Sequence, residues 1–307
     1  MKPLSKKNNG KSSGVISEDI LSNRLSVAKT YKLYIGGQFP RTESGRYYEW
    51  NSPSNHLKVN ICRASKKDFR EAVVSARNAF SVWNKMTAFN RSQIVYRMAE
   101  IMEGRKAQFV EELVHCGSTE KKALAETEKS IDRLVYYAGW CDKYQQIFSS
   151  VNPVASSHFN FSVPEPTGVV SVIAPEEYGL LGLISTMAPV ISGANCCVTL
   201  ASQSKPLPAI TLAEVLNDSD LPGGVINILT GFRSELLEHF STHMDVNGIL
   251  YCGNDEQEKL SVQKNATLNV KRVVLSSHDD WFAEAAQSPY HIQDFQEIKT
   301  TWHPMGV

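Results

Sequence analysis

Cysteines are the side chains of this sequence best suited to nucleophilic or metal chemistry. The chain has six of them: Cys62, Cys116, Cys141, Cys196, Cys197 and Cys252. No pair has the Cys-x-x-Cys spacing typical of metal or redox sites. Cys196 and Cys197 are neighbours on a predicted strand, so their side chains point to opposite faces and are poorly placed to share a metal. The pattern predicts reduced, buried thiols in a cytoplasmic protein.

Acidic residues follow two predicted strands, where a parallel sheet binds its ligands. Glu176 and Glu177 follow one strand, and Asp255 and Glu256 follow another. Clustered carboxylates favour a cation, although such residues are more often a solvated surface. His278 has a ring that can act as a base near neutral pH, but a loop histidine without an identified partner is usually solvated. We therefore expect no metal site and no catalytic histidine, with a ligand site lined by the four acids as an alternative.

The elements that position these residues follow a strand–helix–strand pattern. Residues 169–173 and 196–200 form apolar predicted strands, and residues 178–192 between them form a predicted apolar helix. Two buried strands joined by a helix indicate a parallel sheet covered on both faces. Short helices separate further predicted strands at 225–229, 248–251 and 270–275. We predict an α/β fold with a Rossmann-like, doubly wound parallel sheet of about five strands.

Smaller units flank this sheet. An N-terminal block of hairpins and helices precedes it, and Ser65, Thr87 and Ser118 are predicted N-caps of three of its helices. Alternating polar and apolar residues then predict a small antiparallel hairpin. The first residues are rich in Lys, Ser, Asn and Gly, which predicts a disordered tail. The predicted tail spans residues 1–17, the N-terminal block residues 18–150 and the hairpin residues 151–167. The sheet spans residues 168–278, a linker residues 279–294 and a final strand residues 295–307.

The composition excludes several classes of function. The formal net charge is zero, so the sequence offers no electrostatic basis for binding nucleic acid or a membrane surface. No run of apolar residues is long enough to span a membrane. The polar N-terminus does not have the pattern of a secretory signal. These features predict a cytoplasmic globular protein.

Several motifs of the chain resemble those of the aldehyde dehydrogenase superfamily. Its N-terminal hairpins resemble two stretches of this chain, Leu33-Tyr34-Ile35-Gly36-Gly37 and Asn51-Ser52-Pro53. A sequence typical of the family is also similar to Leu221-Pro222-Gly223-Gly224-Val225-Ile226-Asn227. The resemblance covers residues 31–275. It implies a dinucleotide-binding fold and the NAD- or NADP-dependent oxidation of aldehydes. In this family the reaction proceeds through a cysteine thiohemiacetal, hydride transfer and hydrolysis of a thioester.

The positions that hold the cofactor in this family carry other residues here. Where the family has Lys and Glu for the adenosine ribose, this chain has Leu200 and Gln203. Where the family opens a helix with Gly-Ser-Thr around the cofactor pyrophosphate, this chain has Gly253, Asn254 and Asp255. Asp255 or Asn254 is placed to cap that helix from within the chain. The resemblance therefore implies that no cofactor is bound.

The catalytic positions differ as well. Glu176 and Glu177 follow Pro175, where the family has Trp-Asn and the Asn donates a hydrogen bond to the oxyanion. A carboxylate cannot donate that bond. Ser276 stands where the family has its general-base Glu, and no cysteine falls at the position of the nucleophile. The degenerate cofactor-site positions are Glu176, Glu177, Leu200, Gln203, Gly231, Gly253, Asn254 and Ser276.

The end of the sequence resembles the family's oligomerisation strand. A long catalytic region should follow Leu275 in this family, and only a short stretch separates that residue from residues 295–302. The resemblance implies that this strand pairs with the hairpin 151–167 across a subunit boundary. The alternative is a plain strand that covers the hairpin within one subunit. The residues implied in oligomerisation are Phe159, Phe161, Phe295, Ile298, Thr300 and Trp302.

These departures predict a pseudoenzyme, a protein similar to aldehyde dehydrogenases that does not catalyse their reaction. We expect it to form a homo-oligomer, or a hetero-oligomer with a complete aldehyde dehydrogenase. The alternative is an enzyme half that binds NAD or NADP and complements a separate catalytic chain. The intact pattern of sheet strands favours this alternative, and the altered motifs oppose it.

Overall fold

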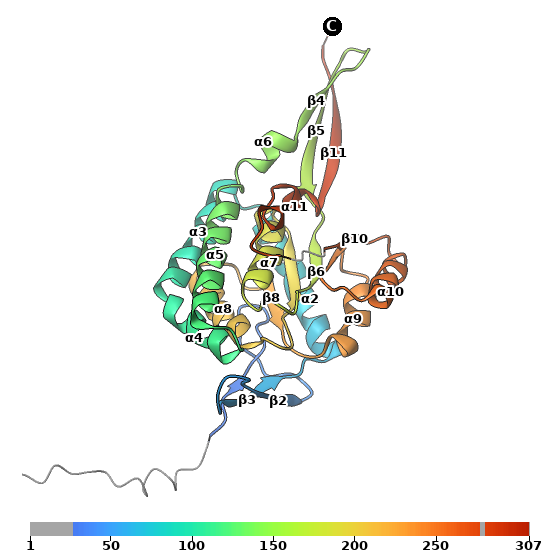
Figure 1. Ribbon diagram of the computed structural model, residues 1–307. Helices are drawn as coiled ribbons and strands as arrows, with labels where there is room; N and C mark the ends of the chain where they lie inside the picture. Colours follow the sequence, from blue (N-terminus) through green and yellow to red (C-terminus); the bar gives the residue numbers. More distant parts are fainter. Residues whose placement is uncertain (1–26, 277–279, 307) are drawn as a thin grey trace, which may run out of the picture.

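The computed structural model describes residues 27–276 and 280–306 (Figure 1). The predicted disordered tail and His278 lie outside this part. At the centre is a parallel sheet with the strand order β10-β9-β6-β7-β8. Its strands are β6 (Val169–Ile173), β7 (Cys196–Leu200), β8 (Ile226–Leu229), β9 (Gly248–Tyr251) and β10 (Arg272–Leu275). The predicted doubly wound sheet of about five strands is confirmed.

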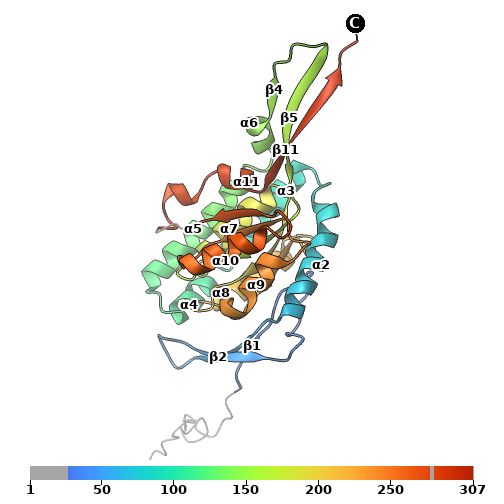
Figure 2. The ribbon, with the colours of Figure 1, turned by 90° about the vertical axis from the view of Figure 1, so that its right-hand side faces the viewer.

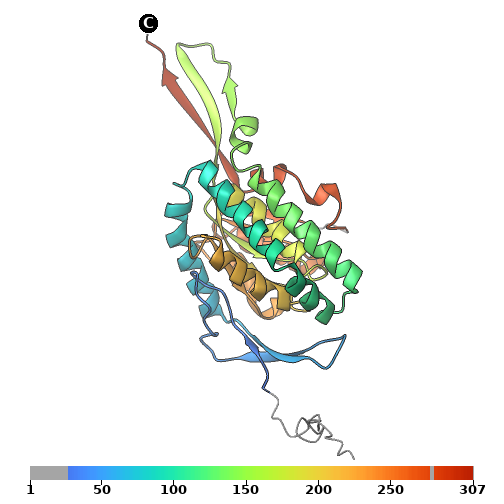
Figure 3. The same cartoon turned by 90° about the vertical axis from the view of Figure 1, so that its left-hand side faces the viewer.

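Helices cover both faces of this sheet. On one face lie α7 (Leu181–Ser192) and α8 (Leu207–Asp218), with α3 (Ala88–Gly104), α4 (Lys106–His115) and α5 (Glu120–Ala138) outside them (Figure 3). On the other face lie α2 (Lys66–Trp83), α9 (Arg233–Thr242) and α10 (Glu256–Ala266) (Figure 2). Every residue of β6, β7 and α7 is buried. None of the helices in the described part of the chain combines the length and the apolar character needed to cross a bilayer.

Two of the three predicted N-caps are confirmed. Ser65 forms a reciprocal capping box with Asp68 at the start of α2, and Thr87 accepts a hydrogen bond from the amide of Asn90 in α3. The prediction for Ser118 was wrong, because Thr119 caps α5. Both residue types have a suitable oxygen, but the amide of Ser118 instead donates to the carbonyl of Leu113 and closes the end of α4.

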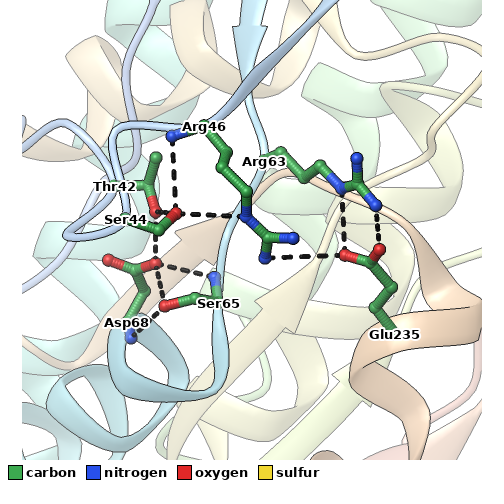
Figure 4. Close-up of polar contacts among 7 residues, drawn as sticks. All are labelled: Thr42, Ser44, Arg46, Arg63, Ser65, Asp68 and Glu235. Atoms are coloured by element: carbon green, nitrogen blue, oxygen red, sulfur yellow. Dashed lines mark hydrogen bonds and ion pairs between the residues drawn. The ribbon is translucent and has the colours of Figure 1, made fainter.

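A polar network ties the N-terminal block to the sheet helices (Figure 4). The Asp68 carboxylate accepts hydrogen bonds from Thr42 Oγ1 at 2.6 Å, from Ser65 Oγ at 2.8 Å and from the amide of Glu43 at 2.9 Å. Burial raises the pKa of Asp68, but these hydrogen bonds outweigh burial and leave the pKa below its ordinary value. Arg63 forms an ion pair with Glu235 of α9. Residues 42–46 and Arg63 of the block are therefore joined to α2 and α9 by polar and charged contacts.

The N-terminal block also contains a small sheet with the strand order β1-β3-β2. Its strands are β1 (Thr30–Tyr31), β2 (Tyr47–Asn51) and β3 (Lys58–Cys62). Between β1 and β2, the predicted hairpin turn at Gly36 and Gly37 is present. Both glycines have positive φ, at 63° and 77°, as a two-residue hairpin turn of this kind requires.

A third sheet projects from the body of the molecule, at the top of Figure 1. It has the order β11-β5-β4 and consists of β4 (Ser150–Asn152), β5 (His158–Pro166) and β11 (Gln296–Pro304). The helix α6 (Tyr144–Phe148) precedes it. β11 pairs antiparallel with β5 of the same chain over its whole length. The expected pairing across a subunit boundary is therefore replaced by the alternative within one chain, since both strands are here long enough to satisfy each other.

The segment between β10 and β11 packs against the helices. It contains a 3₁₀ turn η1 (Glu284–Ala286) and the short helix α11 (Tyr290–Gln293), and lies against α5 and α7. Trp281, Ala286, Ile292 and Phe295 of this segment are buried. The residues expected to form a linker thus contribute to the core.

The buried carboxyl group of Glu112 joins α4 to α8. Glu112 Oε1 accepts a hydrogen bond from Thr211 at 2.6 Å, whereas Oε2 has no partner in the described structure. Burial raises the pKa of Glu112 to about 7. The stability that this raised pKa confers is complete below the unfolded pKa and is lost as pH rises through 7.

We expect Glu112→Gln to flatten the pH dependence of stability. Between about pH 5 and about pH 8 the free energy of unfolding of the parent should fall by up to roughly 3 kcal/mol relative to the variant. Urea unfolding at the two pH values measures this difference. Glu111→Gln, an exposed carboxylate on the same helix, is the control and should leave the profile unchanged.

Candidate functional site

The carboxyl ends of β6, β9 and β10 meet around a pocket of about 210 Å³. It lies where the strand order reverses between β6 and β9, which is the usual ligand position in a doubly wound sheet. We call this pocket the crevice. Of the predicted site residues, it brings together Glu176, Glu177, Gly253, Asn254, Asp255 and Ser276.

Glu176 binds the loop that follows β7. Its Oε2 atom accepts hydrogen bonds from the amides of Gln203 at 3.0 Å and Ser204 at 3.2 Å, and from the hydroxyl of Ser202 at 3.0 Å. These hydrogen bonds hold the Glu176 side chain against the loop. The loop amides therefore have a partner within the chain.

The N-terminus of α10 is capped by the chain itself. Asp255 accepts hydrogen bonds from the amides of Gln257 at 2.8 Å and Glu258 at 2.9 Å, so of the two predicted caps, Asp255 and Asn254, it is Asp255 that caps the helix. These amides and the positive end of the helix dipole are the groups that bind a phosphate at other helix N-termini. Here a carboxylate of the same chain binds them. Asn254 is exposed beside this cap.

A second charged group closes the crevice from α9. Arg233 forms an ion pair with Glu258 at 3.2 Å, and Glu258 also accepts a hydrogen bond from Tyr251. Burial and the bond to Glu258 raise the pKa of the Tyr251 hydroxyl, so this group stays protonated. A Cβ at Gly253 would lie 2.3 Å from the Tyr251 hydroxyl. The backbone at Gly253 is thus packed closely against this network.

Three predicted positions lie away from the crevice. Leu200 is buried at the end of β7, and Gln203 contributes its amide to Glu176 as described. Gly231 has a φ of 150°, and a Cβ there would lie 3.2 Å from the amide of Ala64. Gly231 therefore allows the N-terminal block to approach the sheet closely.

All six cysteines are buried and free. Burial raises the pKa of the Cys141 thiol to about 11 and that of the Cys116 and Cys197 thiols to about 12. It also raises the pKa of Cys252, the cysteine that lines the crevice. A thiol with a raised pKa is a poor nucleophile at neutral pH. The six cysteines are therefore buried, as the sequence predicts, and are poor nucleophiles.

Three of the four acids near the crevice have separate partners. Glu176 binds the loop after β7, Asp255 caps α10, and Glu256 pairs with Lys259 at 2.7 Å. Within residues 27–276 and 280–306, no three His, Cys, Asp or Glu side chains are arranged to hold a metal ion. The acids thus act as caps and surface charges in this arrangement.

Arg133 is a residue that the sequence analysis did not single out. It is fully buried on α5, where it donates to Ser185 Oγ at 2.7 Å, to the Trp281 carbonyl at 3.0 Å and to the Ala286 carbonyl at 2.5 Å. The guanidinium therefore fixes the segment after β10 against α5 and α7. The sequence signal is a charged residue inside the apolar stripe of a helix, between Ser130 and Tyr137.

The residues predicted for oligomerisation lie on two faces of the projecting sheet. Phe159 and Phe161 share a face with Val151, which pairs with Phe161 across β4 and β5. Ile298, Thr300 and Trp302 point to the opposite face, because they pair with Pro164, Ser162 and Asn160. Phe295 belongs to neither face. Its ring is buried against Gly248 in the body of the molecule.

Known proteins match most of this chain. The model of the aldehyde dehydrogenase family matches residues 40–277. The omega-crystallin of Enteroctopus dofleini is 31% identical over 260 residues, which are 82% of this chain and 51% of the crystallin. The chain spans about half the length of such curated relatives. The described residues after 277, which form η1, α11 and β11, lie outside the family match.

Solved structures share the fold. An aldehyde dehydrogenase from Bacillus cereus superposes with a TM-score of 0.77 at 24% identity, over 81% of this chain and 51% of that one. A betaine aldehyde dehydrogenase variant from Staphylococcus aureus, solved in complex with NAD+, has a TM-score of 0.75 at 25% identity, over 80% of this chain and 50% of that one. The sheet and its helices therefore have the same arrangement in all three.

Replacing Arg133 should loosen the segment that it fixes, residues 281–288. Arg133→Met keeps the length of the side chain but leaves the Trp281 and Ala286 carbonyls without this donor. We expect the free energy of unfolding to fall by about 3 kcal/mol and amide exchange to rise in residues 281–288. Arg97→Met, in an exposed ion pair with Asp220, should change stability by less than about 0.5 kcal/mol. Equal effects of the two variants would contradict the anchoring role.

Proposed function

Because the chain belongs to the aldehyde dehydrogenase family, we propose that it is a non-catalytic member of that family which acts through protein assembly. The observation that carries this proposal is the crevice, whose hydrogen-bond donors already bind carboxylates of the same chain. Glu176 takes the amides after β7, and Asp255 takes those at the start of α10.

Charge also opposes a dinucleotide in the crevice. Glu176, Glu177 and Asp255 line it, and the one cation among its described lining residues, Arg233, is paired with Glu258. Two like charges about 4 Å apart repel by roughly 1 to 4 kcal/mol, depending on the effective dielectric. A pyrophosphate would meet that cost and would also have to displace the two carboxylate caps.

The catalytic positions support the same proposal. Ser276 lies at the crevice where the family resemblance implies a carboxylate base, and a serine hydroxyl is not a base at neutral pH. Cys252, the cysteine nearest to this position, is buried and has a raised pKa. We infer that Ser276 and Cys252 supply neither the general base nor the thiolate for aldehyde oxidation.

Assembly has a surface to use. Val151, Phe159, Phe161 and Val163 line an open hollow of about 330 Å³ on one face of the projecting sheet. Val151 and Phe159 are exposed, and the Phe159 and Phe161 rings lie 5.6 Å apart. An apolar face of this kind favours burial against a partner. We propose a second copy of this chain as that partner, or a complete aldehyde dehydrogenase, in the cytoplasm.

The second candidate is an NAD- or NADP-binding half of an aldehyde dehydrogenase that complements a separate catalytic chain. The intact five-stranded sheet favours it, as does the NAD+ complex of the Staphylococcus aureus relative. In this case the carboxylates of the crevice would have to move away when the cofactor binds.

Titration with dinucleotides separates these two candidates. Calorimetry with NAD and NADP into the millimolar range should give no saturable heat, and neither dinucleotide should raise the melting temperature, because binding to the folded state alone would stabilise it. A complete aldehyde dehydrogenase in the same buffer is the positive control. Saturable binding would contradict our reading of Glu176 and Asp255 and would favour the enzyme half.

Substitutions on the two faces of the projecting sheet test the assembly surface. Phe159→Asp and Val151→Asp place charge on the apolar face and should lower the mass measured by light scattering to that of a monomer. Trp302→Asp tests the opposite face, whose residues the sequence analysis also implies in oligomerisation. Leu260→Asp, an exposed apolar residue on α10, is the control and should leave the mass unchanged. Dissociation by Trp302→Asp alone would move the interface to the other face, and a monomeric parent would contradict self-assembly.

A further inference from the structure

A second and larger pocket lies under the segment that follows the family match. It has a volume of about 420 Å³ and opens between α7, β9, β10 and α11. This volume is in the range of small-molecule sites in proteins. Ser276 and Trp281 line both this pocket and the crevice. We call it the roofed pocket, because residues 281–295 cover it, with α11 beside α7 (Figure 1).

The roof is held in place from several sides. Arg133 donates to the carbonyls of Trp281 and Ala286, and both of these residues line the pocket. At the other end of the roof, Arg272 donates to the Asp294 carbonyl at 3.1 Å. The side chains that fix the roof come from α5 and β10, outside the roof itself. A pocket whose wall is fixed before binding loses little entropy when a ligand enters.

The walls are mostly flat and apolar. Trp281 and Phe295 are buried and present aromatic rings, Tyr290 adds an exposed ring, and Leu250 and Val190 add aliphatic surface. Aromatic side chains arranged in this way favour a planar ligand, which they contact through stacked or edge-to-face rings.

The roofed pocket has a carboxylate among its described lining residues, and only His291 among them can carry a positive charge. Pro189 lies inside α7 and has no N–H, so the carbonyl of Ser185 one turn earlier has no donor at the i+4 position. Asp294 adds a carboxylate beside His291, whose ring nitrogen lies 3.4 Å away. No Lys or Arg is among the described residues that line the pocket. The site is therefore suited to a donor or a cation and not to an anion.

We propose that the roofed pocket binds a small planar aromatic molecule that carries a protonated amine. The ring lies against Trp281 and Tyr290, and the ammonium group donates to the Asp294 carboxylate. This site differs from the crevice in its chemistry, because its described lining has no Lys or Arg to bind phosphate groups. The proposal goes beyond the proposed function and does not depend on it.

Two probes with the same ring and opposite charge test this proposal. Tryptamine carries an ammonium group, and indole-3-acetate carries a carboxylate on the same indole. Calorimetric titration into the millimolar range should show saturable binding of tryptamine, with indole-3-acetate binding at least about tenfold more weakly. No binding of tryptamine, or equal binding of the two probes, would overturn the proposal.

Variants locate the binding at this pocket. Asp294→Asn keeps the shape of the side chain and should weaken tryptamine about tenfold, while Tyr290→Ala removes an exposed wall and should weaken both probes. Tyr47→Ala, an exposed ring on β2, is the control and should change neither affinity. Unaltered tryptamine affinity in both pocket variants would overturn the assignment. NAD binding in the earlier titration would contradict the proposed function and leave this result unaffected.

Discussion

The central parallel sheet needs a cover on both faces, because its strands are apolar on both sides. Helices supply most of that cover, and the segment after β10 supplies the rest. Two arginines make this arrangement stable. Arg133 and Arg272 donate hydrogen bonds to backbone carbonyls of that segment and of the first residue of β11. A buried carbonyl without a donor would cost about 1 to 3 kcal/mol. Most of the sheet is thereby covered, and the edge strand β10 stays partly exposed.

At the carboxyl edge of the sheet, backbone amides also need hydrogen-bond partners. Loop amides and helix N-termini at this edge need acceptors, and in dinucleotide-binding sheets a phosphate can be that acceptor. In this chain Glu176 and Asp255 meet the need. The same fold can therefore keep its architecture while the chemistry of its crevice changes, since the donors are backbone groups and their acceptor is set by one or two side chains.

The projecting sheet and the roofed pocket are joined through one residue. Phe295 is buried against Gly248, and its carbonyl accepts hydrogen bonds from Asn195 at 2.9 Å and Thr167 at 3.2 Å. β11 begins at the next residue. The position at which β11 leaves the body of the molecule is thus set by the packing of Phe295, which is a core residue and not a surface residue of the projecting sheet.

The sequence by itself determined the α/β class, the order of the strands along the chain and the caps at Ser65 and Thr87, because local periodicity and capping chemistry depend on near neighbours. The family resemblance also implied changed residues at Glu176 and Ser276. Only the tertiary structure decided which partners those residues take. Arg133 reaches a segment far along the chain, and β11 pairs with β5 of its own subunit. Such contacts join residues more than a hundred positions apart, and neither periodicity nor capping carries information over that distance.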